Sequence, residues 1–238
     1  MQKKYNFFNK RTIVSMLIIL ILIPLTMWFG IKALNDRKYY YISLLMIIYI
    51  MVPFFMTFEN REPQARELII IAVLSATAVI GRSIFFMVPA FKPTIAVIII
   101  AGVTFGAESG FLVGASSAFV SNFIFGQGPW TPWQMFSLGL IGFIAGILKH
   151  RGLLKKKKFN LCIFGFIITY LIYGGIMNFA SVSMYASKIN KEMLIAAYLA
   201  GIPFDSVHAS STVFFLYFMS DTMIEKLDRI RLKYGLLR

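Results

Sequence analysis

The chain has 238 residues, of which 58% are hydrophobic, and its mean hydropathy of +0.75 excludes an ordinary soluble protein. A soluble fold of this composition would leave a large apolar surface in water, whereas a bilayer accepts that surface directly. The net charge of +14 suggests nucleic-acid binding at first sight. However, the basic residues flank apolar stretches and accompany no nucleic-acid-binding motif, so they indicate membrane topology and attraction to anionic membrane lipids. The sequence predicts an all-α, polytopic membrane protein.

Eight apolar stretches predict eight membrane-spanning helices. They comprise residues 12–34, 39–58, 68–91, 94–107, 109–125, 133–148, 159–182 and 193–219. A helix needs about 20 apolar residues to cross a hydrocarbon core of about 30 Å with its backbone amides paired internally. The fourth and fifth stretches are short, so one long buried helix over 94–125, interrupted by Gly106, Glu108 and Gly110, is the alternative.

The positions of the positive charges favour eight spans over seven. Seventeen of the 24 Lys and Arg residues fall in alternate gaps between the stretches. If the N-terminus lies in the cytoplasm, eight crossings place all seventeen on the cytoplasmic side, as the positive-inside rule requires. Fusing 94–125 into one helix would put the basic cluster at 149–158 outside. We therefore expect both termini in the cytoplasm.

Composition divides the chain into three parts. Residues 1–65 contain the cytoplasmic N-terminus and a two-helix transmembrane hairpin that is rich in Ile, Leu, Met and Tyr, and we expect this hairpin to face lipid. Residues 66–220 form a six-helix core rich in Gly, Ala, Ser and Thr, whose small side chains let membrane helices approach closely. Residues 221–238 form a basic cytoplasmic tail that continues the last helix.

A pair of alanines marks a possible contact surface on the first core helix. Ala72 and Ala76 are four residues apart, so they lie on one face of that helix and form a shallow groove. Another helix fits such a groove. The groove serves either a partner subunit or ordinary packing within the bundle.

The segment after this helix is expected to cover a cavity from the outer side. Arg82 precedes an aromatic run that includes Phe86, ends near Lys92 and is broken by Pro89 and Pro93. Non-helical backbone at membrane depth is tolerated only where protein or a water-filled cavity covers it. The alternative for Arg82 is a side chain that extends to the membrane interface.

The second outer loop, residues 125–134, combines two prolines with two of the three tryptophans. A rigid frame that presents flat apolar rings and amide groups is typical of a small-molecule site. The candidate ligand contacts here are Asn122, Gln127, Trp130, Trp133 and Gln134.

Polar residues in the last two spans extend this list. Asp205 and His208 are three residues apart in the last span, which places both on one face of the helix. Ionisable groups at that depth are costly and usually functional. They suit a ligand contact, a proton relay or a structural pair. Tyr173 and Asn178 add polar groups toward the outer end of the seventh span.

The sequence contains no phosphate-binding GxxxxGK[ST] loop and no acidic cluster with metal-ligand spacing. We therefore expect no metal, no cofactor, no enzymatic activity and no use of ATP by this chain alone.

Residues 66–220 resemble the S components, the substrate-capturing subunits of energy-coupling factor (ECF) vitamin transporters. The resemblance rests on the six-helix core with both ends cytoplasmic, on Ala72 and Ala76 in the AxxxA position, and on residues 201–209, GIPFDSVHA. Residues 125–134 look like the branch that captures cobalamin. Queuosine precursors, other tetrapyrroles and other vitamins stay open as ligands.

The resemblance implies a function in a bacterial cell membrane. Such a protein binds a vitamin from outside and docks through Ala72 and Ala76 on a membrane scaffold subunit that two cytoplasmic ATPases power. Segments 82–92 and 126–134 become the lid and the wall of the vitamin site. The N-terminal hairpin departs from the family pattern. The alternative function is a proton-coupled secondary transporter that uses Asp205 and His208.

Overall fold

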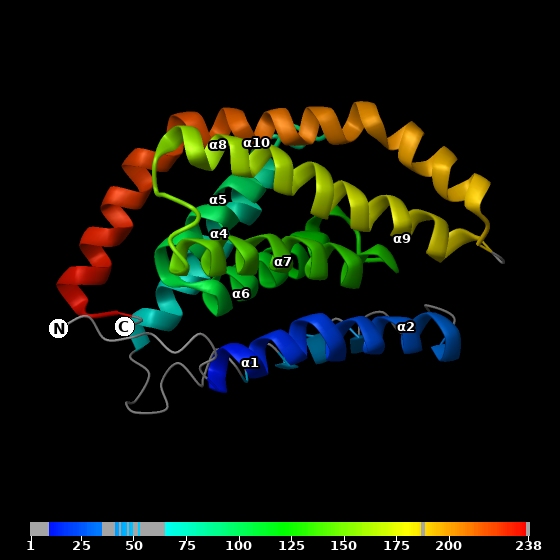
Figure 1. The fold of residues 1–238 in the computed structure, drawn as a ribbon, viewed down its shortest axis with the longest axis horizontal. Helices are drawn as coiled ribbons and strands as arrows, with labels where there is room; N and C mark the ends of the chain where they lie inside the picture. The colour runs from blue at the N-terminus through cyan, green and yellow to red at the C-terminus, as the bar shows by residue number, and fades with distance from the viewer. Residues whose placement is uncertain are drawn as a thin grey trace.

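The structure, a computed structural model, describes residues 10–34, 41–42, 44–46, 48–49, 52, 65–186 and 189–236. The described elements are helices, and no described residue lies in a strand (Figure 1). They are α1 (Lys10–Leu17), the π-helix η1 (Ile18–Leu22), α2 (Ile23–Leu34), α4 (Ala65–Ile84), α5 (Thr94–Phe105), α6 (Ala107–Phe125), α7 (Trp130–His150), α8 (Lys158–Ile168), the π-helix η3 (Thr169–Gly174), α9 (Gly175–Tyr185) and α10 (Lys191–Tyr234). The predicted all-α class is confirmed.

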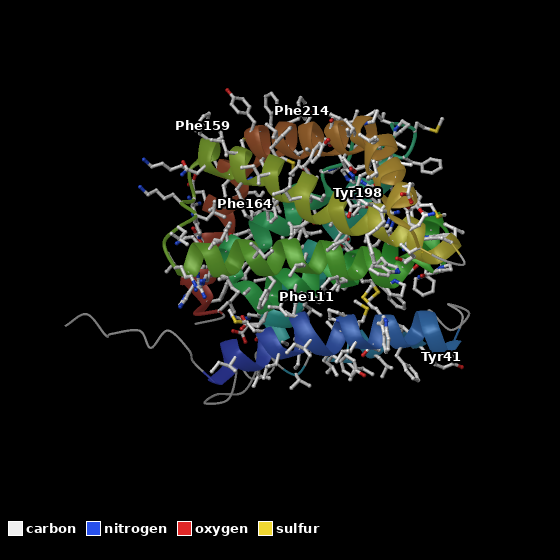
Figure 2. All side chains as sticks on the ribbon, turned by 45° about the vertical axis from the view of Figure 1, so that its right-hand side comes forward. Tyr41, Phe111, Phe159, Phe164, Tyr198 and Phe214 are labelled. Carbon is white, nitrogen blue, oxygen red and sulfur yellow. The ribbon has the colours of Figure 1, made fainter. Side chains whose placement is uncertain are left out.

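The helices are apolar enough for a membrane. Three segments have the length and composition to cross one, namely Ala65–Ile84, Trp130–His150 and Lys158–Tyr185, and two shorter apolar helices cover Ile13–Phe29 and Thr94–Phe105. Figure 2 shows aromatic side chains such as Phe159 and Phe214 on the outside of the bundle, whereas Phe111 is fully buried. An exposed apolar surface of this extent suits lipid. The count of eight spans stays a prediction, and most of the predicted second span lies outside the described residues.

Helix α5 forms the centre of the bundle. All twelve of its residues are buried, and it packs against α4, α6, α7 and α10. A helix that is hydrophobic on every side belongs in the interior. Its length of about 18 Å is shorter than a hydrocarbon core, which a helix surrounded by protein tolerates because its ends contact other helices rather than lipid.

Helices α5 and α6 are separate and antiparallel. The chain reverses at Gly106, whose φ of 100° is a conformation that glycine adopts without strain, and Gly110 thereby approaches Gly102. At the other end Thr94 donates a hydrogen bond to the Ala78 carbonyl of α4. The end of α6 lies beside the same part of α4, because Asn122 accepts a hydrogen bond from Arg82. One continuous helix over 94–125 is therefore excluded.

Helices α6 and α7 approach each other through glycines. A Cβ atom on Gly142 would collide with the carbonyl group of Gly110, and a Cβ atom on Gly114 would collide with the backbone of Leu138. Close backbone contact of this kind maximises van der Waals packing where lipid supplies no hydrophobic drive between helices. It fixes the register between the two helices.

One end of the molecule, which we call the basic end, carries the positive cluster. Here α7 ends, α8 begins, and α10 ends near the start of α4 (Figure 1), where the Arg66 guanidinium lies over the Tyr234 ring. The ammonium group of Lys156 lies 2.6 Å from the Asp228 carboxylate, and that of Lys158 lies 3.1 Å from Asp221. Arg231 donates to the Thr104 carbonyl at 2.8 Å, which satisfies the C-terminal end of α5. We call the opposite end, with residues 85–93 and 126–129, the loop end.

The N-terminal hairpin packs on the core more closely than its composition indicates. Ile19, Ile23 and Met27 are buried, and the Ser15 hydroxyl donates to the buried Glu108 carboxylate of α6 at 3.1 Å. The described part of the hairpin therefore contacts the core with one face, while other apolar residues of it, such as Leu20, are exposed. Apolar residues look alike in a sequence whether lipid or protein covers them.

Gly142→Ala is expected to lower the midpoint of thermal unfolding in detergent. The new methyl group meets the Gly110 carbonyl, and overpacking costs about 1–3 kcal/mol. Gly175→Ala is the matched control, because a Cβ atom there meets no atom within 4 Å. Equal midpoints for the two variants would contradict the close approach of α6 and α7.

Candidate functional site

A buried polar network crosses the bundle at the loop end. The Nη1 atom of Arg82 on α4 donates to Ser121 Oγ at 2.5 Å and to Asn122 Oδ1 at 2.9 Å on α6. The amide of Asn122 donates in turn to Thr131 Oγ1 at 3.1 Å and to Gln134 Oε1 at 2.9 Å on α7. Asn122 is fully buried, so it is the centre through which three helices are joined.

The loop between α6 and α7 belongs to this network. Gln127 donates from Nε2 to the Phe119 carbonyl at 3.0 Å and accepts a hydrogen bond from Thr131 Oγ1 at 2.9 Å. The backbone N–H of Gly128 donates to the same hydroxyl at 3.2 Å. The Gln127 amide therefore holds the loop in a fixed shape.

A second polar pair joins α9 to α10. Asn178 Nδ2 donates to Asp205 Oδ2 at 2.7 Å. A Cβ atom on Gly174 would lie 2.6 Å from the Asp205 carboxylate, and one on Gly201 would lie 2.6 Å from the Asn178 amide. The two glycines make the room that this pair needs.

His208 lies between these two groups of polar side chains. It is 7% exposed, and its ring centroid is 4.7 Å from that of Tyr173, in an edge-to-face contact. Tyr173 also interacts with Gln134, which connects His208 to the α6–α7 network. In the described part of the chain, His208 Nδ1 has no hydrogen-bond partner. A buried polar atom without a partner costs free energy, so this atom is a candidate ligand contact.

The segment from 85 to 93 is anchored to α10. Ser211 Oγ accepts a hydrogen bond from the Lys92 N–H at 2.8 Å and donates to the Lys92 carbonyl at 3.1 Å. The rings of Phe85 and Phe91 both pack against the ring of Phe215, with centroid separations of 5.1 and 5.3 Å. These contacts hold the segment in place over the loop end of the bundle.

This anchoring maintains a strained backbone. Ala90 has a φ of 57°, in the left-handed region, which costs a residue with a side chain about 1–2 kcal/mol. Such conformations persist only where the surrounding contacts determine them, and they concentrate at functional sites.

The three aromatic residues predicted as ligand contacts lie in different places in the structure. Phe86 is 59% exposed and stacks on Phe125 at the surface. The Trp130 indole packs over the backbone of Gly128. Trp133 lines a cavity, and its ring centroid lies 5.8 Å from that of Phe179.

That cavity has a volume of about 520 Å³ and lies between the hairpin and the core. Its lining comes from α2, α7, α9 and the segment before α10, as Pro24, Met27, Trp28, Trp133, Phe136, Phe179, Ser183 and Ile189. The cavity and the polar network occupy neighbouring sides of α7 and α9.

The structure therefore brings together most, but not all, of the polar residues expected at the site. The α4–α6–α7 network with Tyr173 and His208 contains Arg82, Asn122, Gln127, Gln134, Tyr173 and His208. Ser121 and Thr131 were missed because a hydroxyl on a helix gives no sequence signal of its partner. No group of three or more His, Cys, Asp or Glu side chains that could hold a metal occurs among the described residues.

The predicted docking residues lie on the surface. Ala72 and Ala76 are exposed on α4, beside Ile69, Val73 and Ile80, each 56–57% exposed. Ser75 and Ala78 are buried on the opposite side. The small-residue groove therefore faces away from the bundle.

Comparison with protein families extends this description. Residues 63–219 match the family model described as the ECF-type riboflavin transporter, S component. The chain belongs to this family. The match begins just before α4 and ends within α10, so the N-terminal hairpin lies outside it. The family is that of a transporter subunit rather than of an enzyme, and the resemblance to S components is confirmed. The matching model is named for riboflavin, and nothing supports the cobalamin branch.

Several relatives are named UPF0397 proteins. One from Aliivibrio fischeri (strain MJ11) is 33% identical over 143 residues, which cover 53% of this chain and 75% of that protein. One from Vibrio vulnificus (strain YJ016) is 31% identical over 139 residues, covering 53% and 76%. One from Clostridium perfringens is 27% identical over 139 residues, covering 56% and 70%. No solved structure matches this S component.

Asn122→Ala is expected to destabilise the ligand-free S component. The substitution removes the buried amide that the half-buried Arg82 and Gln134 side chains share, and the loss of such hydrogen-bond partners costs about 1–3 kcal/mol. The midpoint of thermal unfolding measures this loss. Ser181→Ala, which removes an exposed local hydrogen bond, is the control. A midpoint that Asn122→Ala leaves unchanged would contradict the central role of this amide.

Proposed function

We propose that this S component captures a vitamin at the loop end of its core and delivers it through an ECF module. The observation that carries the proposal is the buried polar network around Asn122, with an unpartnered nitrogen on His208 beside it. A small-molecule site needs a few precisely held polar groups among apolar walls. All of these groups lie in the part of the chain that matches the S-component model.

The membrane orientation follows from charge. The basic end carries the Lys and Arg cluster of residues 149–158 together with the end of α10, and basic residues favour the cytoplasmic side. The loop end then faces outward, where a vitamin arrives. Both termini are cytoplasmic in this orientation, in a bacterial cell membrane.

The proposed vitamin has a ring system of about the size of riboflavin. The family model is named for riboflavin. The cavity beside Trp133 is a separate feature, because its lining includes neither Asn122 nor His208. The family name therefore carries the preference for a flavin over cobalamin.

The proposed docking surface is the exposed groove at Ala72 and Ala76. Small side chains let the backbone of a second helix approach closely within a bilayer. The chain has no phosphate-binding loop, so uptake requires a scaffold subunit and two cytoplasmic ATPases. The groove offers that scaffold a surface that the core itself does not use.

Titration of the purified S component with riboflavin is expected to quench flavin fluorescence at a one-to-one ratio. The buried network and the aromatic walls suit a planar ring with hydrogen-bonding edges. Cobalamin, added under the same conditions, is expected not to compete. Tight binding of cobalamin without binding of the flavin would contradict the proposed substrate class.

The double variant Ala72→Trp with Ala76→Trp is expected to retain ligand binding but to abolish uptake in cells that contain an ECF module. Two indoles on this face keep a partner helix at a distance without touching the polar network. Leu171→Trp, at a position 65% exposed on η3, is the matched control and is expected to transport normally. Normal uptake by the double variant would contradict docking at this groove.

The proton-coupled alternative has a separate test. In the described structure Asp205 bonds to Asn178 and forms no hydrogen bond with His208. A relay through both residues would need a ligand or water between them. Uptake into vesicles that contain this chain alone, driven by a pH gradient and lost in Asp205→Asn, would favour that alternative over the S-component function.

A further inference from the structure

Two positive charges meet at the loop end. Arg82 lies near the end of α4, and Lys92 lies at the end of the segment that follows it. The ring of Pro93 packs directly against Gly81, which brings the two stretches of backbone together. Burial, with a further contribution from the Arg82 charge, lowers the pKa of Lys92. The two cations therefore share one region and repel each other.

Neither charge is neutralised within the described part of the chain. The ion pairs there are Lys156–Asp228, Lys158–Asp221 and Arg229–Glu225, which all involve the cytoplasmic-side part of α10. Asp205 bonds to the Asn178 amide. A partly buried charge without a counter-ion is costly, so an anion at this place would be favoured.

The two cations also keep donors that no neighbour uses. Both hydrogen bonds of the Arg82 side chain come from Nη1, whereas a guanidinium has five donors on three nitrogens. The hydrogen bonds of Lys92 come from its backbone, through Ser211. The backbone of Lys92 is thus fixed while its ammonium group makes no hydrogen bond to the described residues.

His208 supplies an independent indication of a ligand. Its Nδ1 atom is buried and unpartnered, and His208 lies one helical turn before Ser211, whose hydroxyl is hydrogen-bonded to the Lys92 backbone. The three side chains come from α4, the 85–93 segment and α10. A bound polar group would accept hydrogen bonds from the unused donors and would pair with the buried His208 nitrogen.

We infer that the vitamin captured by this S component carries an anionic group, a carboxylate or a phosphate ester, which binds between Arg82 and Lys92. The inference rests on the proposed function and narrows its substrate class. Guanidinium donors match the planar geometry of carboxylate and phosphate oxygens. Flavin mononucleotide fits the site better than neutral riboflavin does, and a cationic vitamin is excluded.

The same chemistry has a second source, because the headgroup of an anionic lipid in the outer leaflet also presents a phosphate. A lipid phosphate would neutralise the same two cations without contributing to vitamin selection. Binding is therefore compared in nanodiscs of phosphatidylcholine alone and in nanodiscs that contain phosphatidylglycerol.

The test uses matched pairs of ligands in which one member carries an additional anionic group. The pairs are riboflavin with flavin mononucleotide and nicotinamide with nicotinate, titrated into the full chain in phosphatidylcholine nanodiscs. In at least one pair the anionic member is expected to bind about tenfold more tightly or better, a difference of about 1.4 kcal/mol. In Arg82→Gln and in Lys92→Gln this preference is expected to fall to about twofold or less.

Two variants serve as checks. Lys92→Gln removes a charge whose ammonium group makes no hydrogen bond to a described residue, so its result stands even where Arg82→Gln disturbs the network. Lys191→Gln removes an exposed charge at the start of α10 and is expected to leave the preference unchanged. If no anionic member binds more tightly than its neutral partner, or if the preference survives in Lys92→Gln, the inference is overturned.

The remaining outcomes separate this inference from the proposed function. Equal binding of neutral and anionic members, with normal uptake through an ECF module, overturns the inference and leaves the function standing. The absence of binding and of uptake for every ligand overturns both. A preference that is present in phosphatidylcholine and lost when phosphatidylglycerol is added still supports an anion site between the two cations, and it shows that a lipid phosphate competes with the vitamin for that site.

Discussion

The close backbone contact between α6 and α7 is the constraint on which the site depends. Glycines at 110, 114 and 142 leave no side chain between the two helices, so the helices meet in a single register. That register places Asn122 opposite Thr131 and Gln134. A displacement by one residue would rotate the amide by about 100° and leave it buried without a partner. The backbone packing of α6 against α7 thus determines which polar side chains meet.

The basic side chains at the two ends of the molecule have different kinds of partner. At the basic end, lysines of the 151–158 segment pair with carboxylates of α10, and Arg231 satisfies the end of α5. At the loop end, Arg82 bonds only to neutral groups and lies over the Phe125 ring at 4.8 Å. Ion pairs stabilise the basic end internally, whereas at the loop end Arg82 keeps hydrogen-bond donors that no described residue uses. This contrast agrees with a protein that is closed on one side and receptive on the other.

Sequence reasoning predicted the helices better than the contacts between them. The apolar stretches located the described helices, and the positions of the positive charges predicted that residues 94–107 and 109–125 form separate helices, as α5 and α6 do. The polar residues at 82, 122, 134, 173 and 208 were predicted because polar groups at membrane depth are costly and usually functional. The directions of Trp130 and Trp133 were not predictable, since neighbouring rings at the start of a helix point where tertiary packing allows. The role of the hairpin was missed because lipid and protein interiors are equally apolar.

The π-helix η3, Thr169–Gly174, divides the seventh span into two helical segments of different phase. A π turn holds one residue more than an α turn, so everything beyond it is rotated by about 100° relative to a continuous α-helix. Before η3, Gly165 lies against Leu216 and Thr212, whereas Gly174, the last residue of η3, and Asn178 of α9 lie against Asp205. The seventh span therefore contacts α10 through two separate surfaces. A substitution that alters one of these two contact surfaces therefore leaves the other in its register with α10.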